Sequence, residues 1–406
     1  MQNKYARVKI ACYTANISMS IVANLSPVLF LTFHSLYGIS YSLLGLLVLI
    51  NFVTQLSVDL IFSFFSHKFN IPLTVKITPL FTLAGLLIYG LAPVIFANNV
   101  YLGLALGTVL FSVSGGLCEV LISPVIAAIP AKDPDREMSK LHSIYAWGVV
   151  LVIVVSTLFL SVAGTKNWQY LAFIFTLAPL ASALLFAFSE IPPMETPEKA
   201  SDALHLLGSG GVWLCVLAIF LGGAAECTMA QWASGYLEGA LGISKVLGDI
   251  FGVALFSVML GLGRTLYGKI GKNIERVLTL GALGAFICYL TAALVPVPLI
   301  GLAACALTGF CVSMLWPGSL IVASERFPAG GVFIFALMAA GGDLGASIGP
   351  QLIGVITDAV AASGLLAGVI PALSPEQIGM RIGMLTASIF PLCAVFVYKK
   401  FKKYKK

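Results

Sequence analysis

One glutamate, Glu119, interrupts the apolar run SVSGGLCEVLISPVIAAI. The small or polar residues of this run that are spaced by four, three and four positions are Ser112, Gly116, Glu119 and Ser123. This spacing puts them on one face of a helix that is otherwise mostly Val, Leu and Ile. Burial disfavours the charged form of a carboxyl, so a glutamate there can gain and lose a proton. We expect Glu119 to handle a proton or a solute; the alternative is a hydrogen bond that packs two helices.

Further charged residues lie inside apolar runs, where each charge costs on the order of 2.5 to 3.5 kcal/mol. The clear cases are Asp59, Glu226, Arg264 and Asp343. Because such a cost needs an offsetting gain, each residue suggests a functional role. We expect Glu226 to take part in binding, and Asp59, Arg264 and Asp343 to take part in gating.

Aromatic and amide side chains near these charges suit a sugar, whose C–H faces pack on indole and phenol rings while its hydroxyls take hydrogen bonds. Trp232 and Tyr236 are four residues apart, so they share a helix face. The alternative is an aromatic belt at the membrane interface, which we favour for Tyr236 but not for Trp232. Asn24 and Gln231 are further polar candidates, with hydrogen bonding between helices as an equal alternative.

The composition indicates how these residues are positioned. Of the 406 residues, 59% are hydrophobic and 10% are charged, whereas a soluble domain has about 25% charged residues. Twelve apolar runs are each long enough to cross a membrane as a helix. The expected spans are 8–35, 42–66, 73–96, 99–129, 140–163, 168–189, 211–238, 245–268, 275–296, 299–324, 331–359 and 377–400. The sequence therefore predicts an all-α membrane protein.

The basic residues predict the orientation of the spans. If both termini are cytoplasmic, three of the 23 Lys and Arg residues lie outside, Arg264 lies within a span, and the remainder are cytoplasmic. We expect a multi-pass protein of the plasma (cytoplasmic) membrane. The net charge of +6 then reflects topology and contact with anionic lipid, and predicts no nucleic-acid partner. The eight Cys fall in the spans without paired spacing, so we expect neither disulfides nor a metal site.

The chain divides into two halves of six spans. The polar stretch 190–210 separates residues 1–189 from residues 211–406, and we expect it to be a cytoplasmic linker. The segments GGLCEVLISP and TGFCVSMLWP, ending at Pro124 and Pro317, both place Cys two and Pro eight residues after a Gly. A spacing repeated in the two halves is what duplication of a six-helix unit would leave. Transporters built from repeats bind their solutes near the midplane.

This arrangement resembles the major facilitator superfamily over essentially the whole chain. GGLCEVLISP, with Glu119 five residues before Pro124, is similar to the corresponding segment of the fucose permease-like sugar:proton symporters. The segments FLGGAAECTMAQWASGYLEG, GFCVSMLWPGSL and GASIGPQLIG are similar to the same family. Two features depart from it: VANLSPVLF lacks the family's aspartate, and SFFSHKFNIP keeps only Lys68 of the usual basic loop motif.

The resemblance implies two bundles of six transmembrane helices and secondary transport by alternating access. It implies that Glu119 carries the proton or accepts a hydroxyl and that Glu226 is a second polar anchor. It further implies that Trp232 and Trp316 are stacking surfaces from different helices of the cavity. It also implies a charge latch on the cytoplasmic side, which we assign to Arg264 and Glu325 because they lie at similar depth. The alternative is an arginine that snorkels to the interface.

We expect a monomeric transporter of a sugar or similar small polar solute, without a cofactor. Coupling by Glu119 alone, help from Glu226, a sodium ion and facilitated diffusion all remain open. The runner-up is a polyspecific exporter of amphipathic compounds. No catalytic triad, metal cluster or dinucleotide fingerprint is present in the sequence, so we expect no enzyme activity. The substrate, the ion and the direction of transport are not specified by the sequence.

Overall fold

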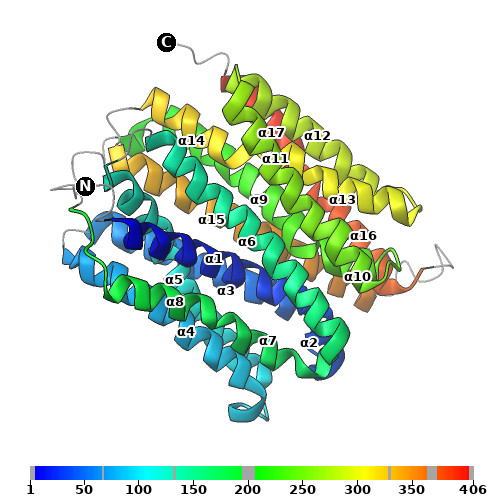
Figure 1. The fold of residues 1–406 in the computed structure, drawn as a ribbon. Helices are drawn as coiled ribbons and strands as arrows, with labels where there is room; N and C mark the ends of the chain where they lie inside the picture. The colour runs from blue at the N-terminus through cyan, green and yellow to red at the C-terminus, as the bar shows by residue number, and fades with distance from the viewer. Residues whose placement is uncertain are drawn as a thin grey trace. The chain divides into compact units, whose positions relative to one another are not determined.

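The computed structural model describes residues 5–65, 68–130, 134–193, 206–327, 331–363 and 373–401, and all secondary-structure elements in these ranges are helices (Figure 1). The helices of the first half are α1 (Ala6–Val28), α2 (Phe30–Tyr37), α3 (Tyr41–Phe65), α4 (Ile71–Ile95), α5 (Val100–Ala128), α6 (Pro134–Ala163), η2 (Thr165–Asn167), α7 (Trp168–Phe175) and α8 (Leu177–Ala187). Those of the second half are α9 (Gly210–Gly239), α10 (Lys245–Leu247), η4 (Gly248–Ala254), α11 (Leu255–Ile270), α12 (Ile274–Leu294), α13 (Pro298–Val312), α14 (Leu315–Arg326), α15 (Gly331–Ser363), α16 (Pro375–Ala387) and α17 (Ile389–Phe401).

The apolar runs form helices that are long enough to cross a membrane. Within the described ranges eleven spans meet this condition, and a twelfth is added when α1 and α2, bent by 45° at a break, are counted together. The predicted all-α membrane fold is therefore confirmed. Part of the predicted linker, residues 194–205, lies outside the described residues, as do residues 402–406 of the basic tail.

The chain folds into two compact units. Unit 1 comprises Met1–Ser26 and Ile50–Asp202, and unit 2 comprises Pro27–Leu49 and Ala203–Lys406. The segment Pro27–Leu49 thus packs with the second half of the chain, although it precedes most of the first half in sequence. The two units are described separately below.

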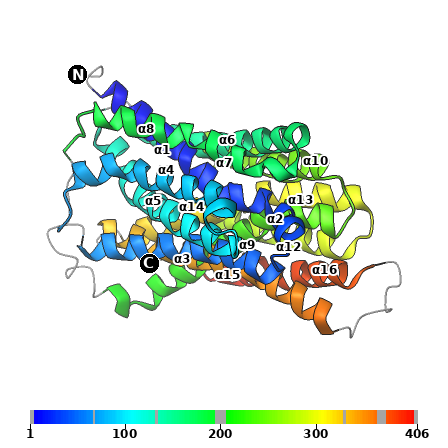
Figure 2. The same ribbon diagram turned by 90° about the horizontal axis from the view of Figure 1, so that it is seen from below.

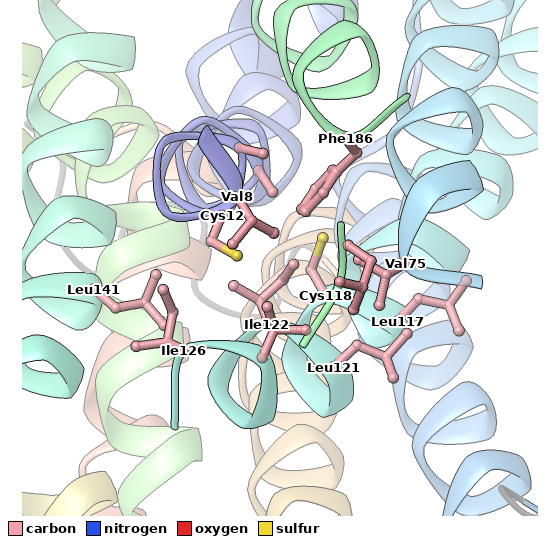
Figure 3. Close-up of a cluster of buried hydrophobic side chains, with 14 of the residues drawn as sticks. Val8, Cys12, Val75, Leu117, Cys118, Leu121, Ile122, Ile126, Leu141 and Phe186 are labelled. Atoms are coloured by element: carbon pink, nitrogen blue, oxygen red, sulfur yellow. The ribbon is translucent and has the colours of Figure 1, made fainter. Parts of the chain in front are cut away.

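In unit 1, α4 packs against α5, α7 and α8, and α5 packs against α6 (Figures 1 and 2). Figure 3 shows the buried cluster in which Cys12 of α1, Ile122 of α5 and Phe186 of α8 meet. Arg7 Nη1 donates a hydrogen bond of 2.7 Å to the carbonyl of Phe188, so α1 begins beside the end of α8. The first span therefore starts on the side of the membrane where the sixth span, which contains α7 and α8, ends. An even number of spans requires this.

A polar contact joins α1 to the start of α6 outside the apolar part of that helix. Lys9 Nζ lies 3.2 Å from Glu137 Oε2, and Tyr13 OH donates to the same oxygen at 3.2 Å. The hydrogen bond from Lys9 holds the pKa of Glu137 below its usual value. The carboxylate is therefore charged at neutral pH and ties the two helices together.

In unit 2, α9 packs along α15, α15 packs on α16, and α12 packs on α13 and α17. Arg326 Nη2, at the end of α14, donates to Glu275 Oε1 at 2.8 Å and to the carbonyl of Phe401 at 2.6 Å. The start of α12 and the ends of α14 and α17 therefore lie at the same end of unit 2.

Proline explains one of the helix breaks in unit 2. Helix α13 ends at Val312 and α14 begins at Leu315. In a continuous helix the carbonyl of Ser313 would accept the N–H of residue 317, but Pro317 has none. The break therefore leaves the carbonyl of Ser313 available to another partner.

Candidate functional site

The predicted polar face of α5 lies against α3 in unit 1. Ser112 Oγ donates a hydrogen bond of 2.6 Å to Asn51 Oδ1. A Cβ atom added at Gly116 would lie 3.0 Å from the carbonyl oxygen of Gln55, so the two helix backbones approach closely there. Asn51, Gln55 and Asp59 follow at intervals of four along α3, which places Asp59 at the next turn.

The second acidic residue of this helix pair is Asp59. Carboxylate oxygens of Asp59 and Glu119 lie within 4.8 Å of each other, and the Asp59 side chain is fully buried. The sequence predicts a gating role for Asp59, and the first span offers no carboxylate that could pair with Glu119. The interval of four from Asn51 through Gln55 to Asp59 indicates a polar face of this span, but it does not identify the helix that the face contacts.

Two carboxylates this close, one of them fully buried, repel each other when both are charged. Such a pair binds one proton between its members, and the proton belongs to the pair rather than to either residue. A small cation held between the two carboxylates would neutralise the pair in the same way. The arrangement is therefore suited to binding a proton or an ion.

The amide candidates are buried. Asn24 Nδ2 donates to the carbonyl of Ser20 in its own helix at 2.9 Å, and Gln231 in α9 is 5% exposed. In contrast, Asn16 Nδ2 donates to the carbonyl of Leu141 in α6 at 2.7 Å. Asn16 therefore makes a bond between helices, whereas that of Asn24 stays within α1.

The second charged centre lies in unit 2, where Arg264 of α11 meets Glu226 of α9. Arg264 Nη2 lies 3.0 Å from Glu226 Oε1 and 3.4 Å from Oε2, and Nε donates to the carbonyl of Ser313 at 3.0 Å. This is the carbonyl that Pro317 leaves without its usual partner. A Cβ at Gly263 would collide with Ser313 Oγ, so the glycine lets α11 approach the break.

The predicted partner of Arg264, Glu325, does not pair with it in this structure. Glu325 is exposed near the end of α14, whereas Arg264 is bound to Glu226 and to the Ser313 carbonyl. The physical reason is the rotation of α11, which directs the guanidinium towards α9 and the α13–α14 break. Similar depth in the membrane was therefore not sufficient to identify the pair.

Trp316 packs on α9 one turn before Glu226. Its ring fills the space above two glycines: a Cβ at Gly342 would collide with Cη2, and one at Gly223 would lie 2.9 Å from Cζ3. Gly223 is one turn before Glu226 on α9, and Gly342 precedes Asp343 on α15, whose side chain is 2% exposed. The half-buried indole and the ion pair thus belong to one region of unit 2.

Trp232 and Tyr236 are both 1% exposed. Trp232 Nε1 donates to the carbonyl of Pro350 at 2.8 Å, and its ring centroid lies 5.3 Å from that of Phe30. Tyr236 OH donates to the carbonyl of Ala292 at 2.7 Å. This burial contradicts the aromatic-belt interpretation of Tyr236. The ring of Trp232 is covered in this structure by aromatic residues of Pro27–Leu49.

Sequence reasoning missed several charged residues that hold Pro27–Leu49 within unit 2. Lys245 Nζ donates to the carbonyl of Val28 at 2.8 Å and lies 3.3 Å from Asp249 Oδ2. Asp249 is fully buried in the π-helical turn η4, where Ser234 Oγ also donates to it. The interval of four between Lys245 and Asp249 could have identified this pair.

Asp358 and Glu376 bind the start of α3. The backbone N–H of Ser42 donates to Asp358 Oδ2 at 2.7 Å, and Ser42 Oγ donates to the same oxygen. A carboxylate at this position satisfies an N–H group that a helix start leaves without a partner. Tyr41 OH donates to Glu376 Oε2 at 3.4 Å. These contacts fasten α3 to α15 and α16.

Solved transporters share this fold. The chain matches a structure of the D-xylose–proton symporter with a TM-score of 0.78 and 15% identity, covering 96% of this chain and 97% of that one. A bacterial homologue of the human lysosomal transporter Spinster matches at 0.73 and 16% identity, covering 100% and 98%. The E. coli fucose:proton symporter matches at 0.61 and 16% identity, covering 96% and 99%. At these identities the similarity shows the fold alone.

No curated protein sequence is similar enough to this chain to count as a match. The model of the Major Facilitator Superfamily matches residues 11–350, which is well over half of the chain. The chain therefore belongs to the Major Facilitator Superfamily.

Proposed function

We propose that this chain moves a sugar or a similar small polar solute across the membrane by alternating access, coupled to protons. The observation that carries this proposal is the pair of Asp59, which is fully buried, and Glu119, which is partly buried, with carboxylate oxygens within 4.8 Å. Two neighbouring carboxylates withdrawn from water are costly unless they bind a proton or an ion, so their presence favours coupled transport over facilitated diffusion. Two proteins of the same fold are named as symporters of a sugar and a proton.

Uptake into proteoliposomes tests this function. Vesicles that contain the purified full chain are given radiolabelled monosaccharides, one at a time. Uptake is measured with equal pH on both sides and with a more acidic outside. We expect at least one monosaccharide or monosaccharide derivative to accumulate when the outside is more acidic. Uptake of amphipathic cations together with indifference to every sugar would favour the exporter instead.

The contacts of Pro27–Leu49 in unit 2 support alternating access. Lys245 holds the carbonyl of Val28 and Asp358 holds the N–H of Ser42, so the ends of the first two spans are fastened to the second half. Trp232 is covered by Phe30 of the same segment. We infer that these bonds break when the transporter opens at the end where Pro27–Leu49 lies. The same movement would expose Trp232 to the solute.

We propose that both termini and residues 190–210 are cytoplasmic and that the membrane is the plasma membrane. Ala200→Cys should react with a membrane-impermeant maleimide only after cells are permeabilised, because the basic residues place this stretch inside. Lys166→Cys, in the turn η2 on the opposite side, should react in intact cells and serves as the control. Reaction of Ala200→Cys in intact cells would reverse the orientation.

For Trp316 we expect a direct contribution to solute binding. Trp316→Ala should weaken binding of the transported solute by about 1 kcal/mol or more, because a half-buried indole one turn along α9 from Glu226 offers a face for stacking. Calorimetry on the purified protein measures this affinity. Trp147→Ala is the matched control, because Trp147 is 65% exposed on α6. Equal affinities of the Trp316 variant and the unmodified protein would remove Trp316 from the site.

A further inference from the structure

We propose that Arg264 binds the carboxylate of a sugar acid, so that the solute of this transporter is an anion rather than a neutral sugar. This inference rests on the proposed function and names its substrate class. It concerns the region of unit 2 where Arg264 pairs with Glu226, and where Trp316 packs on Gly223, one turn before Glu226.

The first observation is how the guanidinium uses its donors. Nε is engaged by the Ser313 carbonyl, and Nη2 by both carboxylate oxygens of Glu226, at 3.0 and 3.4 Å. Within the described part of the chain no hydrogen bond engages Nη1. Glu226 therefore contacts one nitrogen and leaves the two-nitrogen edge formed by Nη1 and Nη2 incompletely used. This edge matches a carboxylate in the fork geometry that makes arginine the preferred residue for such anions.

The second observation is that the arginine is held in place and remains accessible. The Ser313 carbonyl, left without a partner by Pro317, fixes Nε, and Gly263 allows the close approach of α11 to that carbonyl. The Arg264 side chain nevertheless keeps 26% of its surface exposed, and that of Glu226 keeps 14%. The guanidinium is therefore held in a fixed orientation and is partly open to a further anion.

The third observation is the neighbouring indole. Trp316 is three residues after Ser313 and packs on Gly223, one turn before Glu226. A sugar ring that stacks on Trp316 can therefore direct its carboxylate to Arg264, while Glu226 accepts hydrogen bonds from the hydroxyls of the sugar. A sugar acid carries all three of these features: an apolar ring face, hydroxyls and a carboxylate.

The arrangement also implies competition. The carboxylate of Glu226 and that of the solute share one guanidinium, so removing the charge of Glu226 should strengthen binding of an acid. Glu226→Gln keeps the size and the hydrogen-bonding capacity of the side chain. A role of the ion pair in packing alone would give no such gain.

Calorimetric binding and proteoliposome uptake, both with the full chain, test the inference with two matched pairs of probes. D-glucuronate is compared with D-glucose, and D-galacturonate with D-galactose; the members of each pair differ only at C6. We expect at least one acid to bind about tenfold or more tightly than its neutral partner, as a charge-assisted hydrogen bond predicts. Arg264→Gln should abolish this preference, and Arg264→Lys should retain only part of it because the fork geometry is lost.

Two further variants separate binding from folding. Glu226→Gln should bind the acid more tightly than the unmodified protein, which a folding defect cannot produce. Arg276→Gln removes the same charge at an exposed position of α12 and should keep the preference. Transport of neutral sugars with indifference to both acids would overturn the inference and leave the proposed function standing. Failure of every sugar and acid to bind or move would overturn both.

Discussion

Glu119→Gln is expected to abolish accumulation of solute against its gradient while leaving exchange of solute across the membrane intact. Glutamine still offers hydrogen bonds to neighbouring groups, but it does not take up or release a proton. Asp59→Asn should have the same effect, because the proton belongs to the pair of carboxylates. The double variant should lose no more than either single variant, since the two residues act as one unit.

Uptake driven by a pH gradient and exchange between preloaded and external solute are measured in the same proteoliposomes. Glu190→Gln, at an exposed carboxyl after α8, is the matched control and should keep both activities. If Glu119→Gln accumulates solute as the unmodified protein does, Glu119 has a packing role. Its position on a helix face of small and polar residues would then reflect only the close approach of α3 and α5.

Gly345→Ala is expected to lower the thermal stability of the protein strongly. A Cβ atom at this position would collide with the carbonyl oxygen of Phe220 and lie 3.0 Å from the backbone nitrogen of Ala224. Both atoms belong to the backbone of α9, so no side chain can rotate out of the way. Helices α9 and α15 would have to separate, and such overpacking costs on the order of 1 to 3 kcal/mol or more.

Unfolding in detergent can be followed with a thiol-reactive dye, because Cys12, Cys118, Cys215 and Cys305 are buried. Gly235→Ala is the matched control: Gly235 lies within α9, and an added Cβ would meet nothing within 4 Å. Alanine also favours the helix over glycine, so this variant should be as stable as the unmodified protein or more so. Equal melting temperatures for the Gly345 variant and the unmodified protein would show that the close contact is dispensable.

The spans could be predicted from the sequence because the thickness of the membrane sets a minimum length for each apolar run. The bend between α1 and α2 was not predicted, although Pro27 lies next to it. Nor was the grouping of Pro27–Leu49 with the second half, because it depends on contacts between residues about 200 positions or more apart, such as Lys245 with Val28. Such contacts leave no periodic signal along the chain.

The candidate site was predicted in its residues but not in their pairing. Glu119 and Asp59 were both identified as charges in spans, yet the sequence does not show that α3 faces α5. Depth along the membrane suggested that Arg264 meets Glu325, whereas the rotation of α11 about its axis directs it to Glu226. The depth of a residue in the membrane follows from its position along a span. The rotation of a helix about its axis depends on how it packs against its neighbours.

Proton movement caused by the solute tests coupled transport most directly. Proteoliposomes containing the full chain and a trapped pH-sensitive dye are kept without a pH gradient or sodium, and the solute identified by the uptake panel is added outside. Inward symport predicts that the interior acidifies as the solute enters, and that Glu119→Gln removes the acidification. Entry of the solute with no change in internal pH would contradict proton coupling.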